Sequence, residues 1–150
     1  KLDFGNSYRT GKPVFDDIFM RLPVSIKVAF LGMLLATVMG LPLGVLSAVK
    51  QYSPADSFLR VASTVLVAMP TFWLAMLLIL VFALYLGWLP AGGALTWQSY
   101  ILPTITVGVP YGSKVLRMTR STMLEEIRQD YVRTARSKGV PERRSFMAMP

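Results

Sequence analysis

Long apolar runs alternate with short polar segments along most of the chain. No charged side chain occurs in residues 28–49 or in residues 61–113. A helix of about 20 apolar residues is long enough to cross the roughly 30 Å of hydrocarbon in a bilayer. The surface of a soluble domain is difficult to build from such stretches, because about a quarter of its residues are normally charged. The pattern therefore predicts helices that cross a membrane, separated by polar turns.

The apolar runs predict an all-α, polytopic membrane protein with three transmembrane helices. We place these helices at about residues 23–49, 58–86 and 99–120, inside a membrane core that covers residues 23–128. The connection over residues 50–60 is short and polar, so we expect a turn between two antiparallel helices.

Two polar segments flank this core. Residues 1–22 are expected to form an external loop segment, since Gly5, Gly11 and Pro13 interrupt any regular helix there. The chain begins without an initiator Met and without the pattern of a signal peptide, so we expect both ends to continue in a longer protein. At the other end, residues 129–150 form a basic segment with helical periodicity.

Small residues recur at every fourth position of the first predicted helix. Such a stripe lets a neighbouring helix approach closely in lipid, so we interpret it as a packing surface and not as part of a pore. The stripe consists of Gly32, Ala36, Gly40, Gly44 and Ala48.

Prolines occur in every predicted helix, at positions 42, 70, 103 and 110. Each removes a backbone hydrogen bond, so we expect a kink at Pro42, a kink or unwound turn at Pro70 and interruptions at the other two. Two interpretations stay open at this point. The bends are ordinary features that neighbouring helices tolerate, or the bend at Pro70, beside Thr71 and Trp73, helps to shape the path of a solute.

Basic residues are concentrated towards the C-terminus. Residues 114–150 hold nine Lys or Arg against four Asp or Glu, whereas residues 87–113 hold neither kind. The positive-inside rule therefore places residues 114–150 in the cytoplasm. Three spans then place the 50–60 turn in the cytoplasm as well. The aromatic, uncharged loop of residues 87–100 and Lys1 are expected outside, which implies at least one further helix upstream.

Composition narrows the possible chemistry. Cys and His are absent, which removes thiolate ligands, the commonest metal ligand and the usual general base. We therefore expect no catalytic residue, no metal site and no cofactor. The string GVPYGSK at residues 108–114 is not a phosphate-binding loop, because its glycine spacing and its order of Ser and Lys differ from G-x-x-x-x-G-K-[ST]. The chain is not expected to be an enzyme or to hold its own nucleotide site.

The basic tail has the pattern of two helices joined by a turn. Apolar residues up to Ala135 fall near one helical face. Gly139 is expected to cap the first helix in a left-handed conformation, and Pro141 suits the first turn of a second helix. Nucleic acid is not expected as a partner, because Tyr131 and Phe146 alone make no stacking surface.

The string DYVRTARSKGVPERR, residues 130–144, resembles the cytoplasmic coupling motif of bacterial ABC-importer permeases. Further similar strings are DFGNSYRTGKPV, LPLGVLSAVK, MPTFWLAMLLILVF and RMTRSTMLEE. The resemblance covers about residues 3–146 and points to the B-type subunit of the dipeptide, oligopeptide and nickel importers, which are binding-protein-dependent transport systems. It implies the second, third and fourth helices of a six-helix permease, followed by a coupling hairpin.

This resemblance implies a permease subunit that couples ATP hydrolysis by a partner to the uptake of peptides or a related small solute, with nickel as another candidate. The implied partners are ABC ATPase subunits, a second homologous permease subunit, an external solute-binding protein and membrane lipid. The implied location is the bacterial inner membrane. The residues that would contact the ATPase are Tyr131, Arg133, Thr134, Ala135, Arg136, Gly139 and Arg143.

The residues also allow one alternative of a different class. A small membrane anchor or assembly protein could have the same spans and a basic, lipid-binding tail, and it would not transport. Anionic lipid attracts such a tail by about 1 kcal/mol for each basic residue near the surface.

Overall fold

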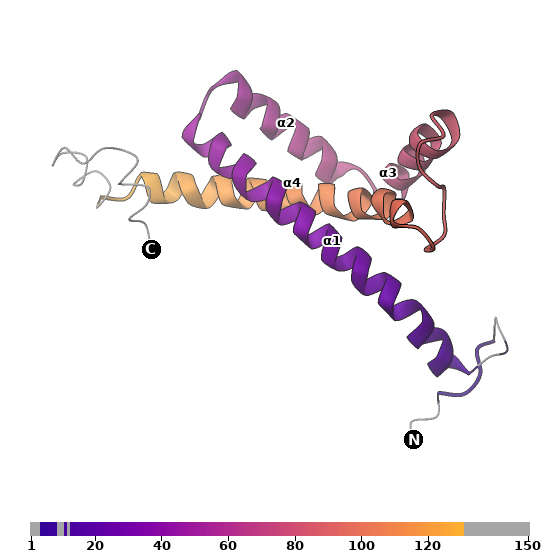
Figure 1. The fold of residues 1–150 in the computed structure, drawn as a ribbon. Coiled ribbons are helices and arrows are strands. Elements are labelled where there is room, and N and C mark those ends of the chain that lie inside the picture. Colours follow the sequence, from indigo (N-terminus) through magenta and orange to yellow (C-terminus); the bar gives the residue numbers. More distant parts are fainter. Residues whose placement is uncertain (1–3, 9–10, 12, 131–150) are drawn as a thin grey trace. The chain divides into compact units, whose positions relative to one another are not determined.

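The computed structural model describes residues 4–8, 11 and 13–130, and helices dominate them (Figure 1). The described residues contain no β-strand, and only an isolated bridge pairs Asn6 with Pro13. The all-α fold class is therefore confirmed. The helices are α1 (Val14–Val49), α2 (Pro54–Ala68), α3 (Thr71–Leu78), the π-helix η1 (Ile79–Tyr85), the 3-10 helix η2 (Trp97–Tyr100) and α4 (Ile101–Ile127).

The chain divides into two compact units. The first contains the described residues up to 35 and residues 70–109, and we call it the cavity unit. The second contains residues 36–69 and the described residues from 110 to 130, and we call it the ion-pair unit. Both α1 and α4 contribute to each unit.

Helix α1 begins earlier than the sequence pattern suggests. It starts at Val14, so the last part of residues 1–22 is helical and not a loop. Pro13 directly precedes the helix, and Asp16 and Asp17 lie in its first turn, where negative charge is favourable. Gly5 and Gly11 do interrupt regular structure before the helix, with φ of 69° and 67°. The external location of residues 1–22 stays a prediction.

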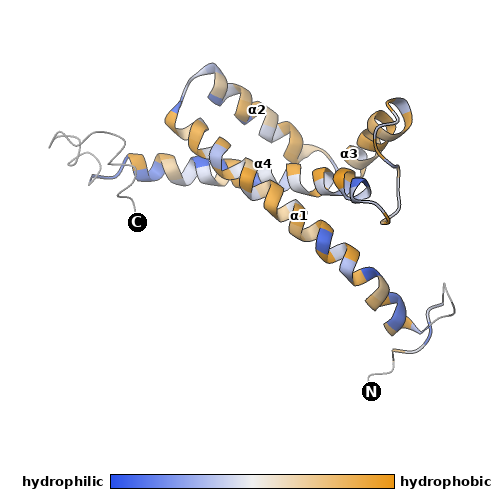
Figure 2. Ribbon diagram, viewed as in Figure 1, coloured by the Kyte–Doolittle hydropathy of each residue, from blue (hydrophilic) through white to orange (hydrophobic). Residues whose placement is uncertain are grey.

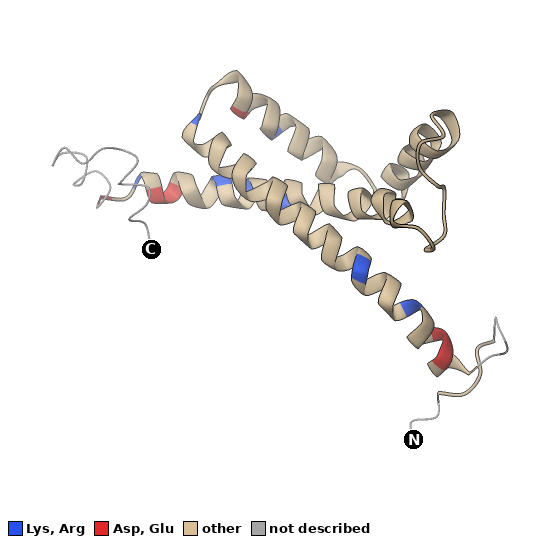
Figure 3. Cartoon of the chain, viewed as in Figure 1, with Lys and Arg blue, Asp and Glu red and all other residues tan. Residues whose placement is uncertain are grey.

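Of the described helices, only α1 is long and apolar enough by itself to cross a membrane. Its charged residues lie at its N-terminal end (Figure 2). Helices α2 and α3–η1 pass the same test only when they are taken together as one broken span. Helix α4 is less apolar, because it contains threonines, prolines and, from Lys114 onwards, charged residues (Figure 3). The count of three spans therefore stays a prediction.

The four predicted proline effects have different outcomes. At Pro70 the expected break is confirmed, because α2 ends at Ala68 and Met69 is extended with ψ of 128°. Pro42 does not interrupt α1, and α4 continues through Pro103 and Pro110, so the predicted interruptions of α4 are wrong. Pro103 lies in the first turn, where its missing N–H has no helical partner to lose. Pro110 lies inside the helix, where its nitrogen cannot donate the usual hydrogen bond to the carbonyl four residues earlier.

The stripe of small residues packs against α4, as predicted. All five of its residues are buried. In the ion-pair unit, a Cβ atom at Gly40 would lie 2.7 Å from the carbonyl oxygen of Gly112, and one at Gly44 would lie 2.8 Å from that of Leu116. In the cavity unit, a Cβ atom at Gly108 would lie 3.0 Å from the carbonyl oxygen of Gly32. The glycines therefore permit backbone contacts that any side chain would prevent.

Candidate functional site

The predicted path residues do not all line the same hollow. Pro70 and Thr71 are exposed at the start of α3, and Trp73 donates its backbone N–H to the Pro70 carbonyl at 3.1 Å. The Trp73 side chain lines a hollow of about 370 Å³ whose other walls are apolar residues of α3 and η1. Neither Pro70 nor Thr71 lines that hollow. The break at Pro70 thus positions Trp73, while a role in solute movement stays a prediction.

The predicted ATPase-coupling residues lie outside the described residues. They are Tyr131, Arg133, Thr134, Ala135, Arg136, Gly139 and Arg143. Helix α4 ends at Ile127, a few residues before this segment begins.

The cavity unit contains a larger hollow, of about 760 Å³, between α1 and the segment that leads into α4. Its walls are mainly apolar and aromatic, and they include Trp97 and Tyr100. The Lys27 ammonium lies 5.8 Å from the centre of the Tyr100 ring, and Lys27 is the only charged residue of this lining. Thr104 also lines it, and its buried hydroxyl has no hydrogen-bond partner among the described residues. An apolar pocket with a few polar groups is the usual form of a small-molecule site.

A buried ion pair is the centre of the ion-pair unit. Asp56, in the first turn of α2, is fully buried, and Arg120 of α4 binds it through two hydrogen bonds. The Arg120 Nε and Nη2 atoms lie 2.8 Å and 3.0 Å from the two carboxylate oxygens. Ser47 near the end of α1 donates its hydroxyl to the same carboxylate at 2.5 Å. The backbone N–H of Tyr52 adds a fourth hydrogen bond, at 3.1 Å.

The local sequence positions the Asp56 carboxylate for its hydrogen bonds. Ser53 caps α2 by accepting a hydrogen bond from the Asp56 N–H, and Pro54 occupies the first turn. Tyr52 has a φ of 65°, an uncommon conformation for a side chain of this size, and it directs its own N–H towards the carboxylate. Arg120, Ser47 and the Tyr52 amide hold the pKa of the Asp56 carboxyl well below its usual range, although burial acts in the opposite direction.

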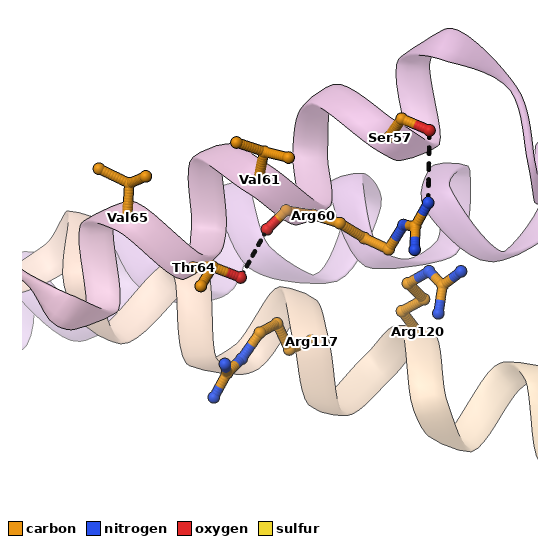
Figure 4. Close-up of a pocket in the computed structure, with 7 residues that line it drawn as sticks. All are labelled: Ser57, Arg60, Val61, Thr64, Val65, Arg117 and Arg120. Atoms are coloured by element: carbon orange, nitrogen blue, oxygen red, sulfur yellow. Dashed lines mark hydrogen bonds between the residues drawn. The ribbon is translucent and has the colours of Figure 1, made fainter.

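Beside this ion pair, α2 and α4 enclose a cleft of about 530 Å³ that is rich in arginine (Figure 4). We call it the arginine cleft. The Arg60 side chain donates to the Ser57 hydroxyl at 3.3 Å and lies 3.5 Å from the Asp56 carboxylate. Arg117 is exposed and makes no ion pair or hydrogen bond within the described part of the chain. The lining consists of Ser57, Arg60, Val61, Thr64, Val65, Arg117 and Arg120.

Sequence reasoning missed both the ion pair and the cleft. Asp56 and Arg120 are 64 residues apart, so no local pattern joins them. One signal was present, because Asp56 is the only carboxylate between Asp17 and Glu125. An isolated carboxylate in a largely apolar stretch requires a partner of opposite charge when it is buried.

Comparison with known proteins agrees with the resemblance of the sequence motifs. The profile of the family described as binding-protein-dependent transport system inner membrane component matches residues 40–149. The glutathione transport system permease protein GsiC of Escherichia coli (strain K12) is 38% identical over 140 residues. GsiC of Shigella dysenteriae serotype 1 is also 38% identical, and that of Salmonella typhimurium (strain LT2) is 37% identical.

Each match covers 93% of this chain but 46% of the relative, so the chain spans less than half the length of these relatives. The family match nevertheless covers most of the chain and includes most of the ion-pair unit. The chain therefore belongs to the binding-protein-dependent transport system inner membrane component family, the permeases of ABC importers.

Proposed function

We propose that the chain contributes three transmembrane helices, at about residues 23–49, 58–86 and 99–120, to the permease subunit of an ATP-driven importer. The observation that carries this proposal is the 38% identity to a transport permease over nearly the whole chain. The apolar length of α1 and the paired length of α2 and α3–η1 support the first two helices. The uncharged half of α4, up to Ser113, supports the third.

The proposed solute is a peptide or a related small molecule. The named transport system of the relatives carries glutathione, which is a peptide, and this favours a peptide over nickel for this chain. The hollow of the cavity unit offers suitable chemistry. Lys27 can bind a carboxylate, and the aromatic rings of Trp97 and Tyr100 can contact apolar groups.

Energy for transport is proposed to come from partner subunits that hydrolyse ATP. Residues 129–150 would form the coupling hairpin that these ATPase subunits bind, with Gly139 at its turn. A second homologous permease would complete the path, and an external solute-binding protein would deliver the solute. The chain itself would hold no nucleotide site and no cofactor.

The proposed topology places the 87–100 loop outside and the 50–60 turn and the tail inside. Single cysteines introduced by Gly93→Cys and Ser145→Cys in the complete permease test this orientation. An impermeant thiol reagent added to intact cells should label the first variant and not the second. The opposite labelling pattern would reverse the topology.

Uptake measurements test the function. The complete permease, produced with its partner subunits in cells that lack other peptide importers, should take up a labelled tripeptide and should not accumulate labelled nickel. Gly139→Val should strain a left-handed turn by about 1 to 2 kcal/mol. We therefore expect normal abundance of this variant in the membrane, weaker co-purification of the ATPase and little or no uptake.

Two results would contradict the proposal. A Gly139→Val permease that keeps its ATPase and transports at the wild-type rate would show that the hairpin does not couple. Absence of uptake of any peptide by a correctly assembled wild-type complex would instead favour the anchor alternative.

A further inference from the structure

The arginine cleft contains more arginine side chains than carboxylates that could neutralise them. Arginine stays protonated at any physiological pH. Arg60, Arg117 and Arg120 share the cleft and its rim with the single carboxylate of Asp56. Arg120 uses both oxygens of that carboxylate, and Arg60 lies 3.5 Å from it with its side chain half exposed. The charge of Arg117 is left without a counterion in the described part of the chain, so the cleft is suited to an anion.

The chemistry of the lining favours a phosphate ester. A guanidinium presents parallel N–H groups that match two oxygens of a phosphate. The Ser57 hydroxyl, which accepts from Arg60, can still donate to a phosphate oxygen, whereas the Thr64 hydroxyl donates to the Arg60 carbonyl at 2.8 Å (Figure 4). The volume of about 530 Å³ lies within the range of small-molecule sites and leaves room for more than one phosphate group.

The apolar part of the lining distinguishes a lipid from a soluble anion. Val61 and Val65 lie one turn apart on α2, and they are 65% and 46% exposed. A free phosphate or an acidic peptide would leave these side chains unused, whereas the acyl chain of a phospholipid would cover them. The cleft therefore places positive charge next to apolar surface. A phospholipid likewise has a charged headgroup next to its acyl chains.

The position of the cleft along the chain agrees with a lipid headgroup. Arg60 is the last charged residue before the uncharged run of residues 61–113, and Arg117 follows soon after it. Basic residues at the ends of apolar spans lie at the level of the headgroups. This step uses the membrane location of the proposed spans and does not depend on the solute or on the ATPase.

We propose that the arginine cleft is a binding site for an anionic phospholipid. The phosphate of the headgroup binds Arg117, and the first part of an acyl chain lies on Val61 and Val65. Arg120 stays bound to Asp56 and adds positive potential without giving up its partner. Arg117 is the residue that selects an anionic headgroup, because its guanidinium has no other partner among the described residues.

Photocrosslinking in the complete permease tests this site. A benzophenone amino acid replaces Val61, and the permease with its partner subunits is reconstituted in equal amounts of phosphatidylglycerol and phosphatidylcholine. Mass spectrometry then counts the two lipid adducts on the labelled peptide. We expect several-fold more phosphatidylglycerol adduct in the wild-type background. Arg117→Gln should lower this preference about five-fold, the factor typical of one basic residue at a membrane surface.

Lys50→Gln is the matched control, because it removes one exposed charge of the neighbouring turn without touching the cleft. It should leave the preference unchanged. Equal adducts of both lipids in the wild type, or a preference that survives Arg117→Gln, would overturn the proposal. A crosslink to protein in place of lipid would overturn it too, since another polypeptide would then fill the cleft. Peptide uptake in the same preparation reports on the proposed function separately.

Discussion

The two units of the chain differ in how fully their buried polar groups are hydrogen-bonded. In the ion-pair unit, Ser47, Asp56 and Ser63 are buried, and each has a hydrogen-bond partner. In the cavity unit, the buried hydroxyl of Thr104 has no partner among the described residues, and the residue lines a hollow of about 760 Å³. A satisfied polar network specifies one geometry, whereas an unsatisfied group marks a place where a ligand or water can bind.

The backbone is also more regular in the ion-pair unit than in the cavity unit. The ion-pair unit is built from regular α-helix and one capped turn. The cavity unit contains the helix start after Pro70, the π-helix η1 and a loop with positive φ at Gly87 and Gly93. Irregular backbone in a membrane protein is expected where it lines a cavity. The ion-pair unit is therefore the more regular of the two, and the proposed solute hollow lies in the less regular one.

The largest loss of stability is expected when the carboxylate at the centre of the ion-pair unit is removed. Asp56→Ala leaves the Arg120 guanidinium, whose side chain is 18% exposed, without its partner. Loss of one member of a buried pair typically costs about 3 to 5 kcal/mol. We therefore expect a strong fall in the thermal midpoint and yield of the complete permease in detergent. The same substitution at the exposed Asp16 serves as control and should change the midpoint only slightly. Equal effects of the two changes would show that the ion pair does not hold the unit.

Close helix packing gives the next largest effect. Gly40→Val introduces a Cβ atom only 2.7 Å from the Gly112 carbonyl oxygen, so the helices must separate. We expect a loss of stability of about 1 to 3 kcal/mol, the usual cost of overpacking. Gly92→Val is the control, since nothing lies within 4 Å of a Cβ atom there. Thermal unfolding of both variants measures the difference, and similar midpoints would argue against close packing at Gly40.

Sequence patterns predicted the parts of this fold that depend on local chemistry. The four-residue spacing of small residues predicted the packing surface of α1, and the proline at position 70 predicted the end of α2. The continuity of α4 through its prolines was missed, because the local propensity against proline inside a helix takes no account of the packing around that helix. The π-helix η1 was missed for a related reason, since a uniformly apolar stretch carries no signal for a change of helical pitch.

The candidate site was predictable only in part. Trp73 does lie beside a break in the helix and its backbone is bonded to Pro70, but its side chain lines a hollow with residues of α3 and η1 that include neither Pro70 nor Thr71. The bond between Asp56 and Arg120 depends on how α2 and α4 pack, which no spacing within either segment reveals. Long-range partners of isolated charges therefore require the structure.

Acid should weaken the ion-pair unit in a defined direction. The pKa of the Asp56 carboxyl is lowered in the folded protein, chiefly by Arg120. The stabilisation by this group is therefore complete above about pH 3.9, the value of an ordinary aspartate, and it is lost as the pH falls towards the folded pKa. Between pH 5 and pH 3 the unfolded chain takes up the proton first, so wild type should lose about 1 kcal/mol more than Asp56→Asn. Thermal midpoints of both proteins over this range measure the difference. A constant gap between them would show that Asp56 is protonated alike in both states.

The smallest effect on stability is expected in the cavity unit, at Thr104. Its hydroxyl is buried without a partner, so Thr104→Val removes an unsatisfied group and keeps the side-chain shape. We expect unchanged or slightly higher stability, by about 0 to 1 kcal/mol. Thr106 is the matched control on the same helix, because its hydroxyl donates to the Leu102 carbonyl at 2.8 Å. Thr106→Val should therefore be the more destabilising of the two.

Uptake by these two variants tests whether the solute occupies the hollow that Thr104 lines. If the solute occupies the hollow, Thr104→Val should raise the KM for peptide several-fold while Thr106→Val leaves it unchanged, since only Thr104 lines that hollow. The measurement is the concentration dependence of tripeptide uptake at matched permease abundance. A large loss of stability in Thr104→Val with normal KM would mean that the hydroxyl is satisfied by another part of the assembled permease. The cavity unit would then be as fully bonded as the ion-pair unit, and the contrast between them would disappear.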